Sequence, residues 1–331
     1  MGLALAGREL APDPQRLAAA FRRVTIRTAA ALDNGDLVAA LEQTAQGLVI
    51  VNSRKHALDL FREAKKAKLD GIIHLTTRQY AAHRREILAN VRQRLVDEQP
   101  CRLIATSLVE AGVDLDFPRV WRAEAGLDQI AQAAGRCNRE GRHRADQSIV
   151  TVFLAPDYPP PPEIKGLSGD MSRMMEKHAD LLSPDAMEAF FGEVYWRLGH
   201  ALDREKILDL FKMDKSGTNF AYRSVAEKFR MIESGMVPVI VARDERAKTA
   251  IEKLGVASVP SGAIARNLQS FIVQVPPMAR NLMIANGHVR FEKEGLRGNQ
   301  FAVLQTPSLY SPEAGLIWED AAYLALENAI L

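Results

Sequence analysis

Short apolar segments alternate with longer amphipathic ones between residues 46 and 155, and this alternation restricts the possible folds more than any other feature. The apolar segments have the length of buried strands and lie at 48–51, 71–75, 103–106, around 120 and at 149–154. Apolar side chains at helical spacing follow the first of them, at Ala57, Leu58, Leu60, Phe61 and Ala64. Strands joined by crossover helices require a mostly parallel sheet, so we predict an α/β unit with helices on both faces.

A chain of 331 residues is longer than one hydrophobic core usually serves, so we expect more than one packing unit. Prolines crowd the stretch 156–169, and we predict a surface linker there because proline continues neither a helix nor a central strand. The predicted division is therefore a lead-in at 1–45, the α/β domain at 46–155, this linker, and a helical region with a small α+β domain at 170–331.

Composition excludes several classes of protein. The two cysteines, Cys101 and Cys137, have no CxxC spacing, so we expect neither a disulfide framework nor a metal site. No run of 18 apolar residues occurs, and residues 1–7 lack the basic start of a signal peptide, so we expect a cytoplasmic protein without a membrane partner. The net charge is only +2, although the segment 52–144 is moderately basic, which weakly favours phosphate contacts over a merely solvated surface.

The strongest chemical signal lies at 132–142, where two arginines stand three residues apart after a glycine and close to a glutamine. Guanidinium groups at Arg136 and Arg139 could reach one triphosphate together, since their forked donors match phosphoryl oxygens. The alternative is an arginine-rich surface turn.

Upstream, residues 105–117 run from a strand end into a loop. A threonine hydroxyl at a strand end suits a nucleic-acid phosphate, so we assign Thr106 to DNA. A glycine followed by an acid suits close approach to a nucleotide, so Gly112 and Asp114 are assigned to nucleotide binding or interdomain coupling. Taken singly, Gly112 is a turn residue and Asp114 a cap.

Two further segments follow the first and second predicted strands, where basic and polar side chains could hold DNA phosphates. The candidates in them are Asn52, Ser53, Arg54, Thr76 and Arg84. The alternative for these segments is structural, with Ser53 as a helix N-cap and His83 as a solvated helix residue.

Taken together and in order, these segments resemble the motifs of the second RecA-like domain of superfamily 2 helicases, and GRCNREG resembles the form found in the type I CRISPR-associated helicase-nuclease. The resemblance implies that Arg136 and Arg139 are arginine fingers and that Gln132 orders the attacking water. One departure is Ala133, which stands where many of these helicases have arginine. Segments 219–230, 237–241, 268–275 and 310–316 resemble the region after the motor in the same family, which extends the likeness from about Leu48 to the C-terminus.

Motifs of the front half are missing from the sequence. There is no phosphate loop and no Gly-Lys pair, no DExH-like acid cluster for Mg²⁺, and no His-Asp dipeptide for a nuclease. We therefore expect ATP and Mg²⁺ to be shared with a missing first RecA-like domain and the chain to be inactive alone. It would be a fragment, a split subunit or the product of an internal start.

The resemblance implies a 3′ to 5′ single-stranded-DNA translocase that acts in CRISPR interference. Its expected partners are single-stranded DNA, the front half of the helicase-nuclease and the RNA-guided surveillance complex. Two alternatives remain open: a catalytically inactive module that holds DNA, the surveillance complex or an inhibitor, and a different enzyme of the superfamily, against which the tail segments count.

Overall fold

The computed structural model describes residue 8 and residues 10–211, 220–229 and 235–321. The first seven residues, which bear on the signal-peptide expectation, lie outside the described residues, as do Asn219 and Arg230 at the ends of the 219–230 segment.

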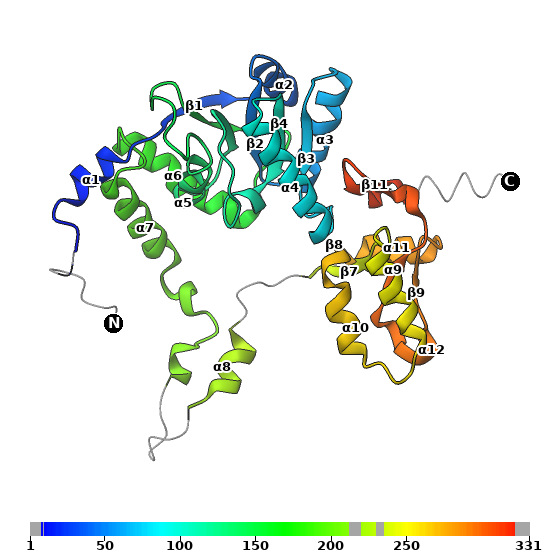
Figure 1. The fold of residues 1–331 in the computed structure, drawn as a ribbon. Helices are drawn as coiled ribbons and strands as arrows, with labels where there is room; N and C mark the ends of the chain where they lie inside the picture. The colour runs from blue at the N-terminus through cyan, green and yellow to red at the C-terminus, as the bar shows by residue number, and fades with distance from the viewer. Residues whose placement is uncertain (1–7, 9, 212–219, 230–234, 322–331) are drawn as a thin grey trace.

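A six-stranded, all-parallel sheet forms the larger part of the molecule, in the order β1-β6-β5-β2-β4-β3 (Figure 1). Its strands are β1 (Thr25–Ala31), β2 (Gln46–Val51), β3 (Ile72–Leu75), β4 (Cys101–Thr106), β5 (Arg119–Ala123) and β6 (Ile149–Leu154). Leu48 of the central strand β2 pairs with Leu103 on one side and Val120 on the other. The predicted parallel α/β fold is confirmed.

Both faces of this sheet are covered, as the side chains of β2 show. Leu48 and Ile50 point into one apolar cluster, which includes Val91 of α4 (Ala81–Val96). Val49 and Val51 point into the other, which includes residues of α2 (Asn34–Glu42) and α3 (Arg54–Lys66). Successive strand residues face opposite sides, so a strand buried on both faces is apolar throughout and lacks the alternation of a half-exposed strand.

The sheet domain begins earlier than the sequence division placed it. The lead-in at 1–45 contains β1, which pairs with β6, and α2, whose Leu37 and Leu41 are fully buried. Before them lies α1 (Pro14–Ala20). Strand β1 is an edge strand with a largely exposed side-chain pattern, so its sequence lacks the apolar run that marks the inner strands.

The proline-rich stretch 156–169 also differs from the expected linker, because α6 (Pro162–Lys177) begins inside it. Proline at the first helical position loses no helix hydrogen bond, so this stretch starts a helix. Together with α7 (Pro184–Leu198), α6 packs on α5 (Leu127–Ala134) through a cluster that includes Met171, Phe190 and Ile130. These two helices therefore belong to the sheet domain.

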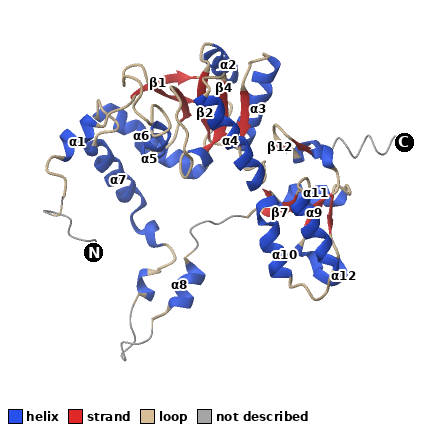
Figure 2. Cartoon of the chain, in the orientation of Figure 1, coloured by secondary structure: helices blue, strands red, loops and turns tan. Residues whose placement is uncertain are grey.

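Beyond α7 the chain passes through two short 3-10 helices and α8 (Tyr222–Lys228) to a small α+β domain (Figure 2). Its four-stranded sheet has the order β8-β7-β10-β9. These strands are β7 (Val237–Ile240), β8 (Ile272–Val275), β9 (Val289–Phe291) and β10 (Ala302–Leu304), and the helices are α9 (Glu245–Glu252), α10 (Ser261–Leu268), α11 (Pro277–Ala285) and α12 (Glu294–Arg297). A small α+β domain after a helical region was the predicted arrangement.

A hairpin of β11 (Tyr310–Ser311) and β12 (Gly315–Leu316) fastens this small domain to the turn after β3. The backbone N–H of Leu316 donates to the carbonyl of Arg78 at 2.9 Å. Gly315 has φ +79°, and a Cβ there would lie 2.5 Å from the Arg78 backbone, so only glycine fits. Arg78 is buried, forms two hydrogen bonds with the Glu319 carboxylate at 2.9 and 2.6 Å, and lies 4.0 Å from the Trp318 ring centre.

Candidate nucleotide and DNA sites

Three of the predicted DNA residues lie at the carboxyl edge of the sheet, where parallel sheets commonly bind ligands. Asn52 follows β2, Thr76 follows β3, and Thr106 ends β4. The turn at 135–140 lies near the amino ends of the strands instead. It follows α5 and is joined by hydrogen bonds to Phe117, which precedes β5, and Asn138 donates to the carbonyl of Arg23, which precedes β1.

Arg136 is buried and holds the loop after β4. Its Nη2 donates to the Glu110 carbonyl at 2.8 Å, and its Nη1 donates to the Val113 carbonyl. Burial lowers the pKa of the guanidinium, and the neighbouring Arg139 lowers it further. In this conformation Arg136 is an internal brace, and it would have to release a carbonyl to reach a phosphate.

Arg139 is the more available of the two arginines. Its side chain is 41% exposed, and its Nε lies 2.8 Å from a carboxylate oxygen of Asp114, which is 73% exposed. The turn that carries it is fixed by Asp116, whose carboxylate accepts from the backbone N–H groups of Arg139 at 2.7 Å and Glu140 at 3.2 Å. An exposed pair of this kind is worth little, so a phosphate could replace Asp114 at small cost.

Gln132 and Gly112 are both exposed. Gln132 lies on α5 one turn before Arg136, and Gly112 adopts φ +70° with open space around its Cα. The left-handed backbone explains the glycine by itself, so its predicted nucleotide role stays a prediction.

The hydroxyl groups of two predicted DNA residues already form hydrogen bonds with the backbone of neighbouring residues. The Ser53 hydroxyl accepts from the backbone N–H of His56 at 3.1 Å and caps α3, which is the structural alternative considered for it. Thr76 is fully buried, and its hydroxyl accepts from the backbone N–H of Arg78 at 3.1 Å. Neither hydroxyl faces an open surface as a phosphate ligand in this conformation.

The remaining DNA candidates are more available but also have partners. Arg54 donates to the carbonyl of Gln274 in β8 at 2.8 Å and lies 4.8 Å from the Trp318 ring centre, so it contacts the small domain. Arg84 donates to the carbonyl of Gln79. Thr106 is half-buried at the end of β4.

Sequence reasoning missed a buried ion pair between Glu110 and Arg122. The Arg122 Nε lies 2.6 Å from the Glu110 carboxylate, and the two side chains are 0% and 3% exposed. Arg122 also donates to the side-chain oxygen of Asn52 at 2.7 Å. The available signal was a charged residue inside the otherwise apolar strand around residue 120, since such a residue is buried only with a partner.

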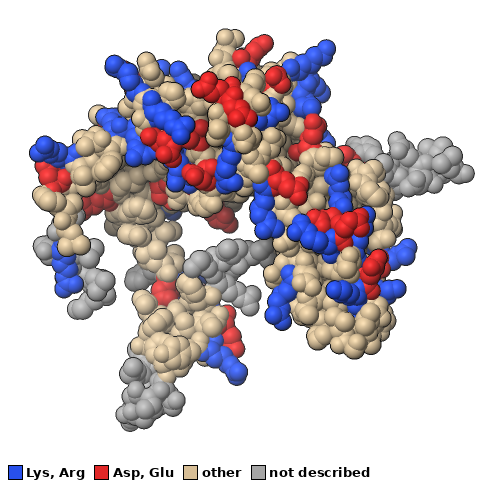
Figure 3. All heavy atoms as spheres, viewed as in Figure 1, with Lys and Arg blue, Asp and Glu red and all other residues tan. Residues whose placement is uncertain are grey.

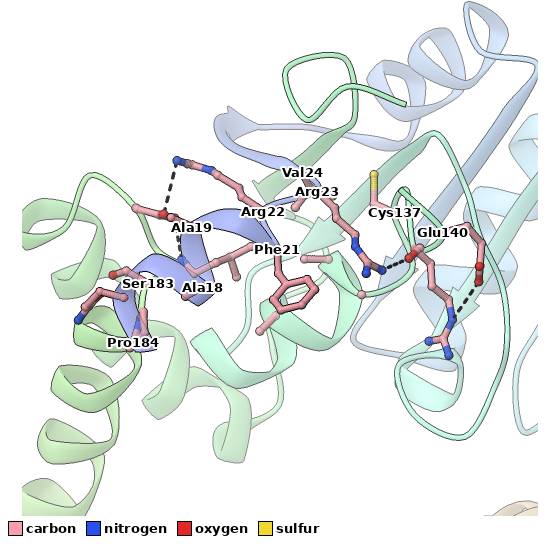
Figure 4. A pocket seen from close by; sticks show the side chains of 17 residues that line it. Ala18, Ala19, Phe21, Arg22, Arg23, Val24, Cys137, Glu140, Ser183 and Pro184 are labelled. Atoms are coloured by element: carbon pink, nitrogen blue, oxygen red, sulfur yellow. Dashed lines mark hydrogen bonds and ion pairs between the residues drawn. The ribbon is translucent and has the colours of Figure 1, made fainter. Parts of the chain in front are cut away.

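A pocket of about 730 Å³ lies beside the arginine turn (Figure 4). It is lined by α1, the start of α7 and the turn residues Gly135, Cys137 and Arg139. In Figure 4 the side chain of Arg23 points to the turn, and it donates to the Arg139 carbonyl. Of the three predicted catalytic residues, Arg139 lines the pocket, whereas Gln132 and Arg136 do not.

Among the described residues, no three His, Cys, Asp or Glu side chains lie close enough to hold a metal ion. Within the part of the chain that the structure describes, no helix is long and apolar enough to cross a membrane.

The all-parallel sheet with helices on both faces defines a class of fold, a RecA-like α/β domain, and a small α+β domain follows it. Residues 43–142 match the family described as CRISPR-associated nuclease/helicase Cas3, C-terminal. The Cas3 protein of Haloferax volcanii is 39% identical over 94 residues, which are 28% of this chain and 10% of that protein. The protein from Methanothermobacter thermautotrophicus is 26% identical over 112 residues, or 33% and 13% of the two chains.

The structural comparison covers more of the chain. The crystal structure of T. fusca Cas3-ATP matches with a TM-score of 0.57 and 16% identity, over 89% of this chain and 42% of that one. A chain in the CRISPR RNA-guided surveillance complex, pre-nicking, matches with a TM-score of 0.58 and 16% identity, over 89% and 44%. The sequence match to the C-terminal Cas3 family model is thus confined to residues 43–142, and the similarity of fold to part of the solved Cas3 structures extends over 89% of the chain. The chain spans less than half the length of each of these relatives.

Proposed function

We propose that this chain supplies the arginine side of an ATP site and part of a DNA track to a helicase-nuclease that moves 3′ to 5′ along single-stranded DNA in CRISPR interference. The observation that carries the proposal is the turn at 135–140 of the RecA-like domain, which holds a braced Arg136 and an exposed Arg139 beside Asp114. The family resemblance supplies the direction of movement and the CRISPR setting.

The chemistry follows from the two arginines. Arg139 exchanges the Asp114 carboxylate for phosphoryl oxygens, and its guanidinium neutralises charge that develops in the transition state. Gln132 orders the attacking water, and Gly112 with Asp114 senses the nucleotide. The phosphate loop and the acids for Mg²⁺ come from a first RecA-like domain, because this sequence has neither.

For DNA, the proposed contacts are Asn52, Ser53, Arg54, Thr76, Arg84 and Thr106. Lys and Arg are interspersed with acidic residues over the face seen in Figure 3, which shows no broad basic surface there. The buried hydroxyl of Thr76 and the capping hydroxyl of Ser53 contribute only if the turns that hold them rearrange. The surveillance complex is proposed as a partner because a chain of similar fold occurs in such a complex.

The test is to supply a first RecA-like domain that carries the phosphate loop and to compare ATP turnover with wild-type and Arg139→Ala chains. An arginine finger contributes about 10³ to 10⁵ in phosphoryl-transfer rate, so the variant should lose at least about 10³-fold in kcat at an unchanged melting temperature. Arg144→Ala is the matched control, since Arg144 is an exposed arginine nearby that pairs with Asp146. Near-normal turnover of Arg139→Ala would favour the alternative of an inactive binding module.

A further inference from the structure

The Glu110–Arg122 ion pair lies between the two proposed sites. On one side, the Glu110 backbone carbonyl accepts from Arg136 at 2.8 Å. On the other, Arg122 Nη1 donates at 2.7 Å to the side-chain oxygen of Asn52. The Asn52 amide in turn donates to the Glu124 carbonyl at 2.7 Å. A series of polar contacts therefore runs from Arg136 through Glu110 and Arg122 to Asn52, the first of the proposed DNA residues after β2.

The contacts of Asn52 also reach α6. The carboxylate of Glu124 accepts from the hydroxyl of Ser168 at 2.7 Å. Because its amide and its carbonyl oxygen are both engaged, the orientation of Asn52 is set from inside the domain. The start of α3 follows directly at Ser53, so a shift of Asn52 is passed to the whole proposed DNA segment.

The cost of burying this pair argues against a purely stabilising role. Burial raises the pKa of Glu110, although the attraction of Arg122 opposes it. Arg122 Nη2 and one carboxylate oxygen of the nearby Asp128 are buried without a hydrogen-bond partner among the described residues. Well-packed apolar residues often replace buried ion pairs at no loss of stability, so an incompletely satisfied pair is better explained by the geometry that it specifies.

We propose that Glu110 and Arg122 are positioning residues that link the arginine turn to the DNA segment, so that movement of the 107–114 loop on one side shifts Asn52 and the start of α3 on the other. The link rests on the proposed function, because it joins the two sites that this function assigns. When the nucleotide draws Arg136 forward, Arg136 releases the Glu110 carbonyl, the 107–114 loop shifts, and Arg122 carries the shift to Asn52.

The experiment measures hydrogen exchange of the full chain, with and without a saturating oligo-dT strand. In the wild type, DNA should slow exchange at 52–56 and also at 110–116, across the ion pair. Allosteric couplings commonly amount to about 5- to 150-fold, so protection of the remote segment should reach about fivefold. Glu110→Gln should abolish the remote protection and keep the local one.

The matched control is Asp170→Asn. Asp170 is a buried carboxylate of α6 whose ion pairs with Arg173 and Arg197 are not part of the series that joins Arg136, Glu110, Arg122 and Asn52. This variant should lower the melting temperature and leave the remote protection intact, which separates a positioning role from a loss of folding. If Glu110→Gln does not fold, Asn52→Ala cuts the same link at a half-buried residue and should abolish the remote protection too.

The two proposals fail in different ways. If the wild type binds no DNA, the DNA half of the proposed function is wrong. The link then still requires that Glu110→Gln speed exchange at 52–56 in the DNA-free chain. Remote protection that persists in Glu110→Gln, or DNA-free exchange that changes only near residue 110, would overturn the link.

Discussion

At the scale of residues, the two arginines of one motif have different physical situations. Arg136 satisfies two carbonyls of the loop after β4, whereas Arg139 forms an exposed pair with Asp114. The sequence identified both positions and their spacing, but it could not show this division, since the partners are backbone atoms brought close by the fold. The same holds for Thr76, whose buried hydroxyl accepts from the backbone N–H of Arg78. The N-cap role of Ser53, in contrast, was the structural alternative that the sequence offered.

We therefore expect Arg136→Ala and Arg139→Ala to differ in stability. Arg136→Ala leaves two buried carbonyls without a donor and should lower the free energy of unfolding by about 1 to 3 kcal/mol. Arg139→Ala removes only a surface pair and should cost at most about 1 kcal/mol. Urea unfolding of the isolated chain measures both values. Equal losses would mean that the braced position of Arg136 is not maintained in solution.

Buried histidines make stability depend on pH. Burial lowers the pKa of His56 to about 4. The ring stacks on Tyr158 at 4.0 Å, and its Nε2 lies 3.1 Å from the side-chain oxygen of Asn34. In the unfolded chain, His56 takes up a proton at its ordinary pKa of 6.5, whereas in the folded chain it does so only near pH 4. The stabilisation that comes from the neutral, buried ring is therefore complete above pH 6.5 and is lost as the pH falls towards 4.

The unfolding free energy of the wild type should fall between pH 6.5 and 4, with a slope to which His56 contributes the uptake of up to one proton on unfolding. His56→Gln should remove this contribution and make the slope shallower. His143→Gln, at an exposed histidine, is the control and should leave the decline unchanged. Denaturant unfolding at several pH values gives both slopes. If the two variants have the same slope as the wild type, His56 is not buried as described.

At the scale of elements, the inner strands were predictable because they are apolar on both faces, as in β2 and β4. Strand β1 was not, since an edge strand with exposed side chains carries little apolar signal. The start of α6 was hidden by prolines, which interrupt a helix only after its first turn. In the small domain, β9 has only three residues, too few to show an alternation of apolar and polar side chains.

Limited proteolysis should first cut residues 199–211 rather than 156–169. Tyr158 stacks on His56 and donates to the Asp59 carboxylate at 3.0 Å, and α6 packs on the sheet domain, so the proline-rich stretch is held at both ends. The 3-10 segment at 199–211 has Leu202 and Leu208 exposed at 57% and 70%. Mass spectrometry of the early fragments locates the cut. Early cleavage at 156–161 would restore the linker first expected there.

At the scale of the whole molecule, the sheet domain has a turn with a buried Arg136 and a partly exposed Arg139 near the amino ends of its strands, and predicted DNA residues at the carboxyl edge of its sheet. The small domain contacts that edge through Trp318 and Glu319, which hold Arg78 and lie near Arg54. The motifs predicted the edge itself. They could not predict this contact, since it joins residues more than 200 positions apart through side chains that have no motif of their own.

The most direct measurement is ATP turnover by the purified chain, with and without an added first RecA-like domain, in the presence of single-stranded DNA. The chain alone should show no turnover above background, because it has no phosphate loop and no magnesium-binding acids. Addition of that domain should give turnover that DNA stimulates and that Arg139→Ala abolishes. Turnover by the chain alone, lost on Arg136→Ala, would contradict the account.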